Sequence, residues 1–533
     1  MRKIFLLFLI IFIVARYSNS YSQTYPYNLE IEQVSIPNAP ALHSFAYAQS
    51  GGKWLFVGGR TNGLHGFSNT ILNFPANKSN QYIWVVDPVS GQSWSRSVYQ
   101  DLSIANADPL RAFNFQFTQN GDYLYMTGGY GRDSTRDSMT TFPKIISIQV
   151  SGIMNAVMNN QSIAPYIIEQ TDTRFQIVGG EMNYMNGYYY LLGGQQFEGE
   201  YRDPPTGTFT QRYTDRVFRF QLSTATSINI SNFTQVQDTT NLHRRDMNVV
   251  PMMTTGGALS LSLYGGVFTK GYPLPFLNPV SVSNTGSVTV DNSFQKLFSQ
   301  YNCPVMSVYD SVNNKMHNTF FGGISLYYYD QTSMSVKRDT LTPFIKDIST
   351  ITKNASGLSS EYLMPIKFTE YLGSNAEFII NPATPQFSSE IINLFKLSGR
   401  TFVGYIFGGI KALLPNLAGS SASTRIFKVY LTNTSVGIEP ISSNLPDKFA
   451  LSQNYPNPFN PTTNINFDIT RSGFTTLKVY DLLGRELKTL LNENLSAGSY
   501  RVEFNAKEQA SGMYFYKLSS GNYSEVKKMT LVK

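Results

Sequence analysis

The chain has 533 residues, of which 42% are hydrophobic and only 14% charged, with 40 glycines and 34 tyrosines; this composition excludes a disordered chain and favours a large β-rich fold. The formal net charge is +7, but +3 of it lies in residues 1–22 and +3 from Leu445 onward (eleven basic minus eight acidic residues), which leaves +1 between them. Because this central part is nearly neutral and has no Lys/Arg run with interleaved aromatics, we expect no nucleic-acid binding.

The first 22 residues have the features of a signal peptide. Arg2 and Lys3 precede an apolar run of eleven residues, Ile4–Val14, and small polar residues follow it. The run is too short to span a bilayer comfortably, and a small-x-small pattern at 18–20 or 20–22 suits cleavage. We therefore predict an exported protein whose mature chain has no transmembrane segment. The alternative for this segment is a buried N-terminal strand.

One pattern, a short apolar run that ends in two glycines, recurs six times. The copies are WLFVGG (54–59), YLYMTGG (123–129), YYYLLGG (188–194), SLSLYGG (260–266), NTFFGG (318–323) and GYIFGG (404–409). Such a run suits a strand that ends where a neighbouring backbone passes too close to leave room for a Cβ. Six copies predict six sheets, the blades of a β-propeller.

Each run lies between further apolar segments that we predict to be strands. The clearest hairpins are those of the second and third repeats, where Asn-Gly turns at 120–121 and 186–187 precede the run. In the sixth blade, the inner strand is either Glu377–Ile380 or Ile391–Leu394. That blade lacks a fourth strand, and the strand Asn28–Ile36 lacks a partner nearby in the sequence, so we expect these to pair and close the ring.

The arrangement resembles the Kelch family of β-propellers, whose repeat has an apolar strand ending in Gly-Gly, a second apolar strand and then a Trp. The first blade matches best, with WLFVGG, YIWVVD (82–87) and Trp94, whereas the others keep only the glycine pair. The pairs are 57 to 86 residues apart, more than the roughly 50 of a Kelch repeat, which we attribute to long surface loops. The resemblance implies an all-β, Kelch-like propeller domain at 23–434, with five or seven blades as alternatives to six.

A polar linker at 435–444 precedes a second domain, 445–533, whose short strands and proline-rich turns predict a small Ig-like β-sandwich. This segment resembles the type A C-terminal sorting domain of the type IX secretion system. The hallmark segments stand in the family's order: NYPNPFNP (454–461), VYDLLGREL (479–487), AGSYRVEF (497–504), ASGMYFYKL (510–518) and KKMTLVK (527–533). The resemblance implies contact with the type IX secretion machinery, passage through the periplasm, and a secreted or outer-membrane surface-attached product. An ordinary structural Ig-like domain is the alternative.

Polar residues recur just before or at the start of the predicted inner strands, one to a blade. They are His43, Arg111, Arg174, Arg245, Asn302 and Asn375. Because inner strands line the central channel of a propeller, we expect these side chains to converge on one mouth and to bind an anionic or sugar ligand through charge-assisted hydrogen bonds. The alternative is structural, with arginines that bridge blades or satisfy carbonyls around a wet channel.

The sequence favours no metal and no cofactor. Cys303 is the only cysteine, which excludes an intramolecular disulfide and a Cys-based metal cluster, and no HExxH, Ca-loop or G-x-S-x-G motif is present. Some copper oxidases share the galactose oxidase-like Kelch propeller, but they need two His, a Tyr and a Tyr-Cys crosslink, and here the histidines and Cys303 fall in different blades.

Two function classes follow from these observations. We favour a secreted binding or interaction module for a glycan or protein ligand. The alternative is a carbohydrate-active propeller enzyme similar to a sugar mutarotase. A compact cluster of ionisable residues at one mouth, with a carboxylate among the arginines, would distinguish the enzyme.

Overall fold

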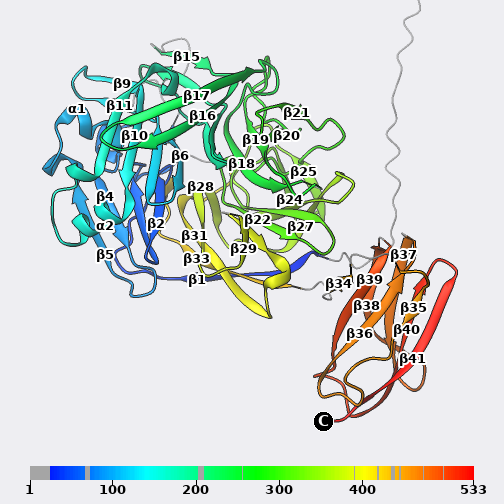
Figure 1. The fold of residues 1–533 in the computed structure, drawn as a ribbon. Helices are drawn as coiled ribbons and strands as arrows, with labels where there is room; N and C mark the ends of the chain where they lie inside the picture. Colours follow the sequence, from blue (N-terminus) through cyan, green and yellow to red (C-terminus); the bar gives the residue numbers. More distant parts are fainter. Residues whose placement is uncertain are drawn as a thin grey trace, which may run out of the picture.

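The computed structural model describes residues 25–66, 73–201, 209–254, 256–388, 390–416, 419–433, 438–442, 446–471, 473–495 and 497–533. The chain folds as a β-propeller followed by a small β-sandwich (Figure 1). The predicted signal peptide lies outside the described residues. Within the part that the structure describes, no helix is long and apolar enough to cross a membrane.

Six antiparallel sheets with four main strands each form the blades of the propeller (Figure 1). The first three blades are β2 (Ala46–Ser50), β3 (Lys53–Val57), β4 (Tyr82–Val86) and β5 (Ser93–Ser97); β6 (Gln116–Asn120), β7 (Tyr123–Thr127), β10 (Lys144–Gln149) and β11 (Ile167–Thr171); and β12 (Glu181–Met185), β13 (Tyr188–Leu192), β16 (Arg216–Thr224) and β17 (Ile228–Gln237). The fourth and fifth are β18 (Arg245–Met253), β19 (Leu259–Val267), β20 (Val280–Ser283) and β21 (Val288–Val290); and β22 (Val305–Asp310), β23 (Lys315–Phe321), β26 (Asp347–Lys353) and β27 (Ser359–Lys367). The sixth is β28 (Tyr371–Ile380), β31 (Arg400–Ala412), β33 (Ile426–Asn433) and β1 (Tyr27–Val34).

The ring closes by pairing the N-terminal strand with the last blade, as the sequence predicted. β1 pairs with β33 in antiparallel register, from Tyr27 opposite Asn433 to Val34 opposite Ile426. Leu29 is buried in the core of this blade, and Tyr27 Oη lies 2.5 Å from Thr319 Oγ1 of the fifth blade. This pairing supplies the outer strand that the sixth blade lacked in the sequence and covers an edge that would otherwise be exposed.

The glycine pairs lie where successive blades meet. A Cβ on the first glycine of each pair would lie 1.8 to 2.6 Å from a carbonyl oxygen of the next blade, with Gly128 and Ile177 O the closest. The N–H of the second glycine donates to that same oxygen in several blades, as from Gly129 to Ile177 O at 2.9 Å. Both glycines have positive φ, 62° at Gly128 and 82° at Gly129. The close backbone approach inferred from the sequence is therefore confirmed.

The inner strand of the sixth blade is β28, which contains Glu377–Ile380, the first of the two predicted alternatives. The second alternative contributes β30 (Ile391–Asn393), which instead pairs in parallel with β22 of the fifth blade. The insertion between β28 and β31 thus extends a neighbouring sheet.

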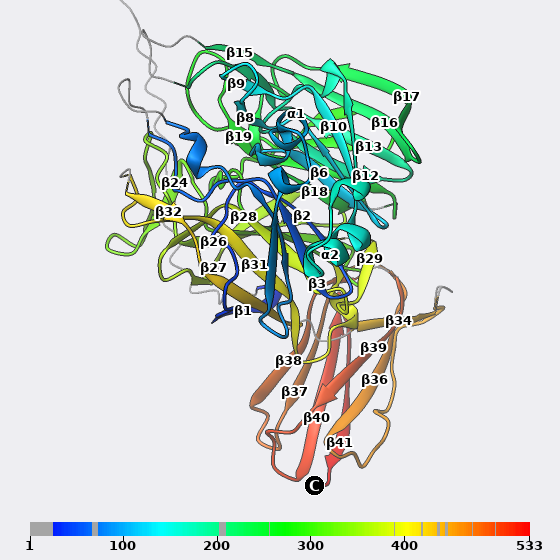
Figure 2. The same ribbon diagram turned by 90° about the vertical axis from the view of Figure 1, so that its left-hand side faces the viewer.

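Two loops carry the long spacings of the second and third repeats and build a further sheet. It consists of β8 (Tyr130–Asp133), β9 (Ser138–Thr141), β14 (Gln195–Glu198) and β15 (Thr210–Tyr213) (Figure 2). β8 and β14 follow directly on the glycine pairs of their blades. Aromatic residues, including Phe113, Tyr130 and Phe197, pack this sheet against the propeller.

The C-terminal part is a sandwich of two antiparallel sheets. One is β34 (Ile438–Ser442), β39 (Gly498–Asn505), β36 (Thr462–Ile469) and β35 (Ala450–Leu451); the other is β38 (Glu486–Leu495), β37 (Gly473–Tyr480), β40 (Gly512–Ser520) and β41 (Tyr523–Leu531). Alternate residues of β36 are buried, as expected for a strand with one face on the core. β34 lies within the range expected as a linker, and it pairs with β39.

Candidate functional site

A ring of residues with left-handed backbone conformation surrounds the channel, one at each inner strand. They are Ser44, Asn114, Gly179, Asp246, Asn302 and Asn375, with φ between 47° and 67°. Backbone hydrogen bonds of 2.7 to 3.3 Å run between neighbours in this ring, from Ser44 to Asn375, Asn114 to Ser44, Gly179 to Asn114, Asp246 to Gly179 and Asn375 to Asn302. The channel therefore narrows at this level, and a cavity lies on each side of it.

The larger cavity, which we call the mouth cavity, has a volume of about 390 Å³ and is lined by all six blades. Two sets of six equivalent residues contribute to its wall. The set directly before the left-handed ring residues is His43, Phe113, Val178, Arg245, Tyr301 and Ser374. The set directly after the glycine pairs is Arg60, Tyr130, Gln195, Val267, Ile324 and Ile410. The two sets face each other in β-bridges, such as that between His43 and Arg60.

Four of the six residues predicted from the sequence line this cavity: His43, Arg245, Asn302 and Asn375. The expectation that all six converge is wrong for Arg111 and Arg174, which line neither cavity.

Both arginines lie on short 3-10 turns several residues before their inner strands, so they point elsewhere. Arg111 donates to Tyr99 Oη, to Asp108 and to the Ala76 carbonyl. These bonds match the structural alternative for the arginines, in which they bridge segments and satisfy carbonyl groups. Arg174 holds Asp172 in a bidentate ion pair and packs on the ring of Phe233, with 42% of its side chain exposed.

Arg245 and Asp246 bring a paired cation and anion into the mouth cavity. The Arg245 guanidinium donates to Asp246 Oδ2 and packs on the ring of Phe268. Burial is the largest single influence on Arg245 and lowers its pKa, but Asp246, Tyr213 and Tyr201 together outweigh burial, so the pKa is raised. Arg245 Nε and Asp246 Oδ1 are both buried and have no hydrogen-bond partner in the described part of the protein.

Arg60 is a second cation in the cavity wall, and sequence reasoning did not find it. It is 1% exposed and packs between the rings of Phe74 and Phe113, at 5.2 and 4.9 Å from their centroids. Its hydrogen bonds go to neutral oxygens, those of the Asn62 side chain and the Pro75 carbonyl. Its pKa is lowered to about 10 by burial, so the group stays charged at neutral pH. The signal that would have found it is its place directly after a glycine pair.

The two histidines of the cavity are neutral at physiological pH. Burial, followed by the charge of Arg60, lowers the pKa of His43 to about 3, and burial lowers that of His65 to about 4. Neutral imidazoles can donate at one nitrogen and accept at the other. Among the described residues that line the cavity, the fixed charges are therefore those of Arg60, Arg245 and Asp246, which sum to +1.

The second cavity, of about 180 Å³, lies on the other side of the ring and has a different character. Three carboxyl groups line it: Glu181, Glu377 and Glu390. Burial raises the pKa of Glu181 and of Glu377, the latter to about 8 with a contribution from Glu390, which is itself exposed. Cys303 also lines it, and burial raises the pKa of its thiol to about 12, so it is not a ready nucleophile.

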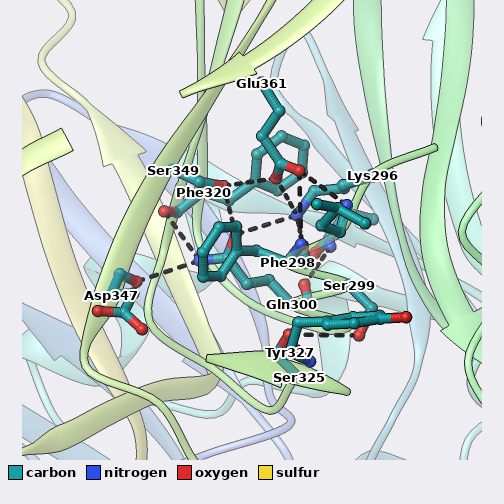
Figure 3. Close-up of polar contacts among 12 residues, drawn as sticks. Lys296, Phe298, Ser299, Gln300, Phe320, Ser325, Tyr327, Asp347, Ser349 and Glu361 are labelled. Carbon is teal, nitrogen blue, oxygen red and sulfur yellow. Dashed lines mark hydrogen bonds and ion pairs between the residues drawn. The ribbon is translucent and has the colours of Figure 1, made fainter. Parts of the chain in front are cut away.

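A buried polar cluster fixes the chain segment that leads to Tyr301 and Asn302 (Figure 3). Lys296 is fully buried, donates to Gln300 Oε1 at 2.9 Å, and lies 3.7 Å from Glu361 Oε1 of β27. Gln300 donates in turn to the carbonyls of Phe320, Gly322 and Asp347. This cluster joins the segment between the fourth and fifth blades to the fifth and thereby positions one wall of the mouth cavity.

Among the described residues, no three His, Cys, Asp or Glu side chains are arranged to hold a metal ion.

Comparisons with known proteins bear on the two parts separately. No curated protein matches the chain. A solved structure titled "Structure of YjhT" is similar over 75% of this chain and 99% of its own, with 11% identity and a TM-score of 0.41. Residues 453–532 match the family described as the secretion system C-terminal sorting domain. The C-terminal sandwich is therefore a type IX sorting domain, which marks the protein for export to the cell surface or the medium.

Proposed function

We propose that the propeller is a binding module that holds a small-molecule or glycan ligand in the mouth cavity, on a protein that its sorting domain delivers outside the cell. The volume of about 390 Å³ lies in the range of small-molecule sites, which run from about 300 to 1,000 Å³. A concave site of this size suits a small ligand or the end of a glycan better than the flat face of a protein partner.

The observation that carries the proposal is the convergence of unpaired buried polar atoms on this one cavity. Arg60 Nη1, Arg245 Nε and Asp246 Oδ1 come from residues of the first and fourth blades, and none has a partner in the described part of the chain. A buried polar group left unpaired costs about 1–3 kcal/mol. A ligand that pairs these atoms would recover this free energy on binding.

A glycan array probed with the purified full chain tests the proposal, with Arg245→Ala as the site variant and Arg174→Ala as the control. Arg174 is exposed and lies outside the cavity, so its loss should leave binding unchanged. Binding that survives Arg245→Ala and Asp246→Ala alike would contradict it.

The alternative function is an enzyme similar to a sugar mutarotase. The Asp246 carboxylate favours it, because this group lies among the arginines of the mouth cavity. A carboxylate in that place is what we expect of an enzyme rather than of a binding module. Against it, Asp246 is held by Arg245, and His43 and His65 are poor bases because their pKa values are about 3 and about 4. Anomerisation of sugars followed by NMR decides between them, since an Asp246→Asn variant should abolish any acceleration.

A further inference from the structure

We propose that the ligand of the mouth cavity is a hydroxylated carboxylic acid, such as a sugar acid, taken either free or as the end unit of an acidic glycan. This inference rests on the proposed function and adds the chemical class of the ligand.

We infer the carboxylate of the ligand from the surroundings of Arg60. Its guanidinium is 1% exposed, and its hydrogen bonds go to an amide oxygen and a backbone carbonyl, with Phe74 and Phe113 on its faces. None of these groups carries a negative charge. A buried cation without a counterion is unfavourable, whereas a carboxylate opposite it forms a strong charge-assisted pair. Arg60 Nη1 is buried and has no hydrogen-bond partner among the described residues, so it is the donor that such a bond would use.

The charge balance of the cavity supports one negative charge on the ligand. Arg245 is already paired with Asp246, and both histidines are neutral, so Arg60 accounts for the net charge of +1 that the described lining residues carry. A monoanion would neutralise the cavity, and a neutral ligand would leave Arg60 without a counterion.

We infer the hydroxyl groups of the ligand from the Asp246 carboxylate. A carboxylate accepts hydrogen bonds and donates none, so the group that pairs with Oδ1 must be a donor. A second carboxylate would be repelled there, whereas a hydroxyl both donates to Asp246 and accepts from Arg245 Nε. Side-chain amides of Asn302 and Gln195 and aromatic rings complete the wall, a combination common in sites for hydroxylated rings.

The floor of the cavity decides how much of a glycan can enter. The ring of hydrogen bonds through Ser44, Asn114 and Asn375 narrows the channel below it, and the exposed Leu341 and Asn416 lie at its rim. A chain that enters from the rim meets this constriction and cannot pass through it. The site therefore suits an end unit rather than the middle of a chain.

Calorimetry with matched acid and neutral probes tests the inference on the full chain. The probes are glucuronate, galacturonate and gluconate, with glucose, galactose and sorbitol as the neutral counterparts, and trigalacturonate separates an end unit from a free acid. We expect an acid to bind at least about tenfold more tightly than its neutral counterpart, as for a hydrogen bond to a charged group. Arg60→Gln should remove this preference and Arg60→Lys should retain part of it, while Arg174→Gln should change nothing.

Each outcome has a defined meaning. Acids that bind no better than the neutral probes, or none of the acids binding, would overturn the inference. If neutral sugars bind and Asp246→Asn abolishes their binding, the proposed function stands, but the inference that the ligand carries a carboxylate is wrong. If Arg60→Gln fails to fold, the inference is tested by the Arg60→Lys variant and by the ratio of the affinities of the unmodified protein for acid and neutral probes. Tighter binding of trigalacturonate than of galacturonate would identify a glycan end as the source.

Discussion

The side-chain amide of Asn375 donates a hydrogen bond of 2.8 Å to Ser44 Oγ, a residue 331 positions away in the sequence. The same amide reaches Asn114 Oδ1 at 3.3 Å, so one side chain of the sixth blade ties together the first and second blades. Asn375 does this from a left-handed backbone conformation, with φ 55°. The floor of the mouth cavity thus depends on a residue that must both adopt positive φ and carry an amide.

Substitutions at Asn375 separate these two requirements. Asn375→Gly keeps the backbone conformation and loses the side-chain hydrogen bonds, which should lower the free energy of unfolding by about 1–3 kcal/mol. Asn375→Ala loses the same bonds and adds about 1–2 kcal/mol of left-handed strain. Urea denaturation should therefore show the alanine variant to be less stable than the glycine variant, the reverse of the usual order. Equal stability would show that the backbone there is not strained.

The glycine pairs offer a matched test of close approach. Gly128 and Gly121 have nearly the same φ, 62° and 59°, but a Cβ at Gly128 would lie 1.8 Å from Ile177 O, whereas nothing lies within 4 Å at Gly121. Gly121→Ala should cost about 1–2 kcal/mol from strain alone. Gly128→Ala should cost more than about 4 kcal/mol or prevent folding. Soluble yield and chemical denaturation measure both, and similar values for the two variants would refute the packing argument.

Closure of the ring should depend on the buried face of β1. Leu29→Ala removes a side chain that is 1% exposed and should destabilise the protein by about 2–5 kcal/mol. Glu32→Ala, on the exposed face of the same strand, loses only a surface ion pair with Arg400 and should change stability by less than about 1 kcal/mol. Thermal melts compare the two. A larger effect at Glu32 would mean that β1 does not dock by its apolar face.

The carboxyl groups of the second cavity predict a dependence of stability on pH. The pKa of Glu377 is raised to about 8 by burial, so the folded protein favours the protonated form and the unfolded chain does not. Its contribution to stability is therefore present below about pH 4.5, the ordinary Glu pKa, and is lost as the pH rises towards 8. Glu377→Gln should reduce the loss of melting temperature between pH 5 and pH 8. Glu503→Gln, exposed on β39, is the control and should leave that slope unchanged.

Export should depend on the sandwich as a whole. Because β34 pairs with β39, a truncation that removes the sorting domain cleanly ends at Asn433, before β34. We expect this propeller to remain folded and to stay in the periplasm of a type IX-competent host, as cell fractionation would show. The converse experiment joins residues 438–533 to a periplasmic reporter, which should then reach the surface or the medium. Release of the truncated propeller would show that another segment carries the export signal.

Much of the architecture could be read from the sequence, because its causes are local. Glycine pairs mark every place where a blade meets its neighbour, and the missing fourth strand of the last blade correctly pointed to the strand near Asn28. Asn302 and Asn375 were predicted as polar residues at the starts of inner strands, and the structure shows that both have positive φ, which asparagine tolerates.

Only the tertiary structure decided which side chains meet. Arg111 and Arg174 looked equivalent to Arg245 in the sequence, but 3-10 turns before β6 and β12 direct them to Asp108 and Asp172. Arg60 was not predicted, because its burial depends on aromatic rings from other loops, Phe74 and Phe113. A sequence determines the strands and their turns through short-range preferences. The convergence of charges from the first and fourth blades on one cavity depends on contacts between residues far apart in the sequence, and these contacts exist only once the ring has closed.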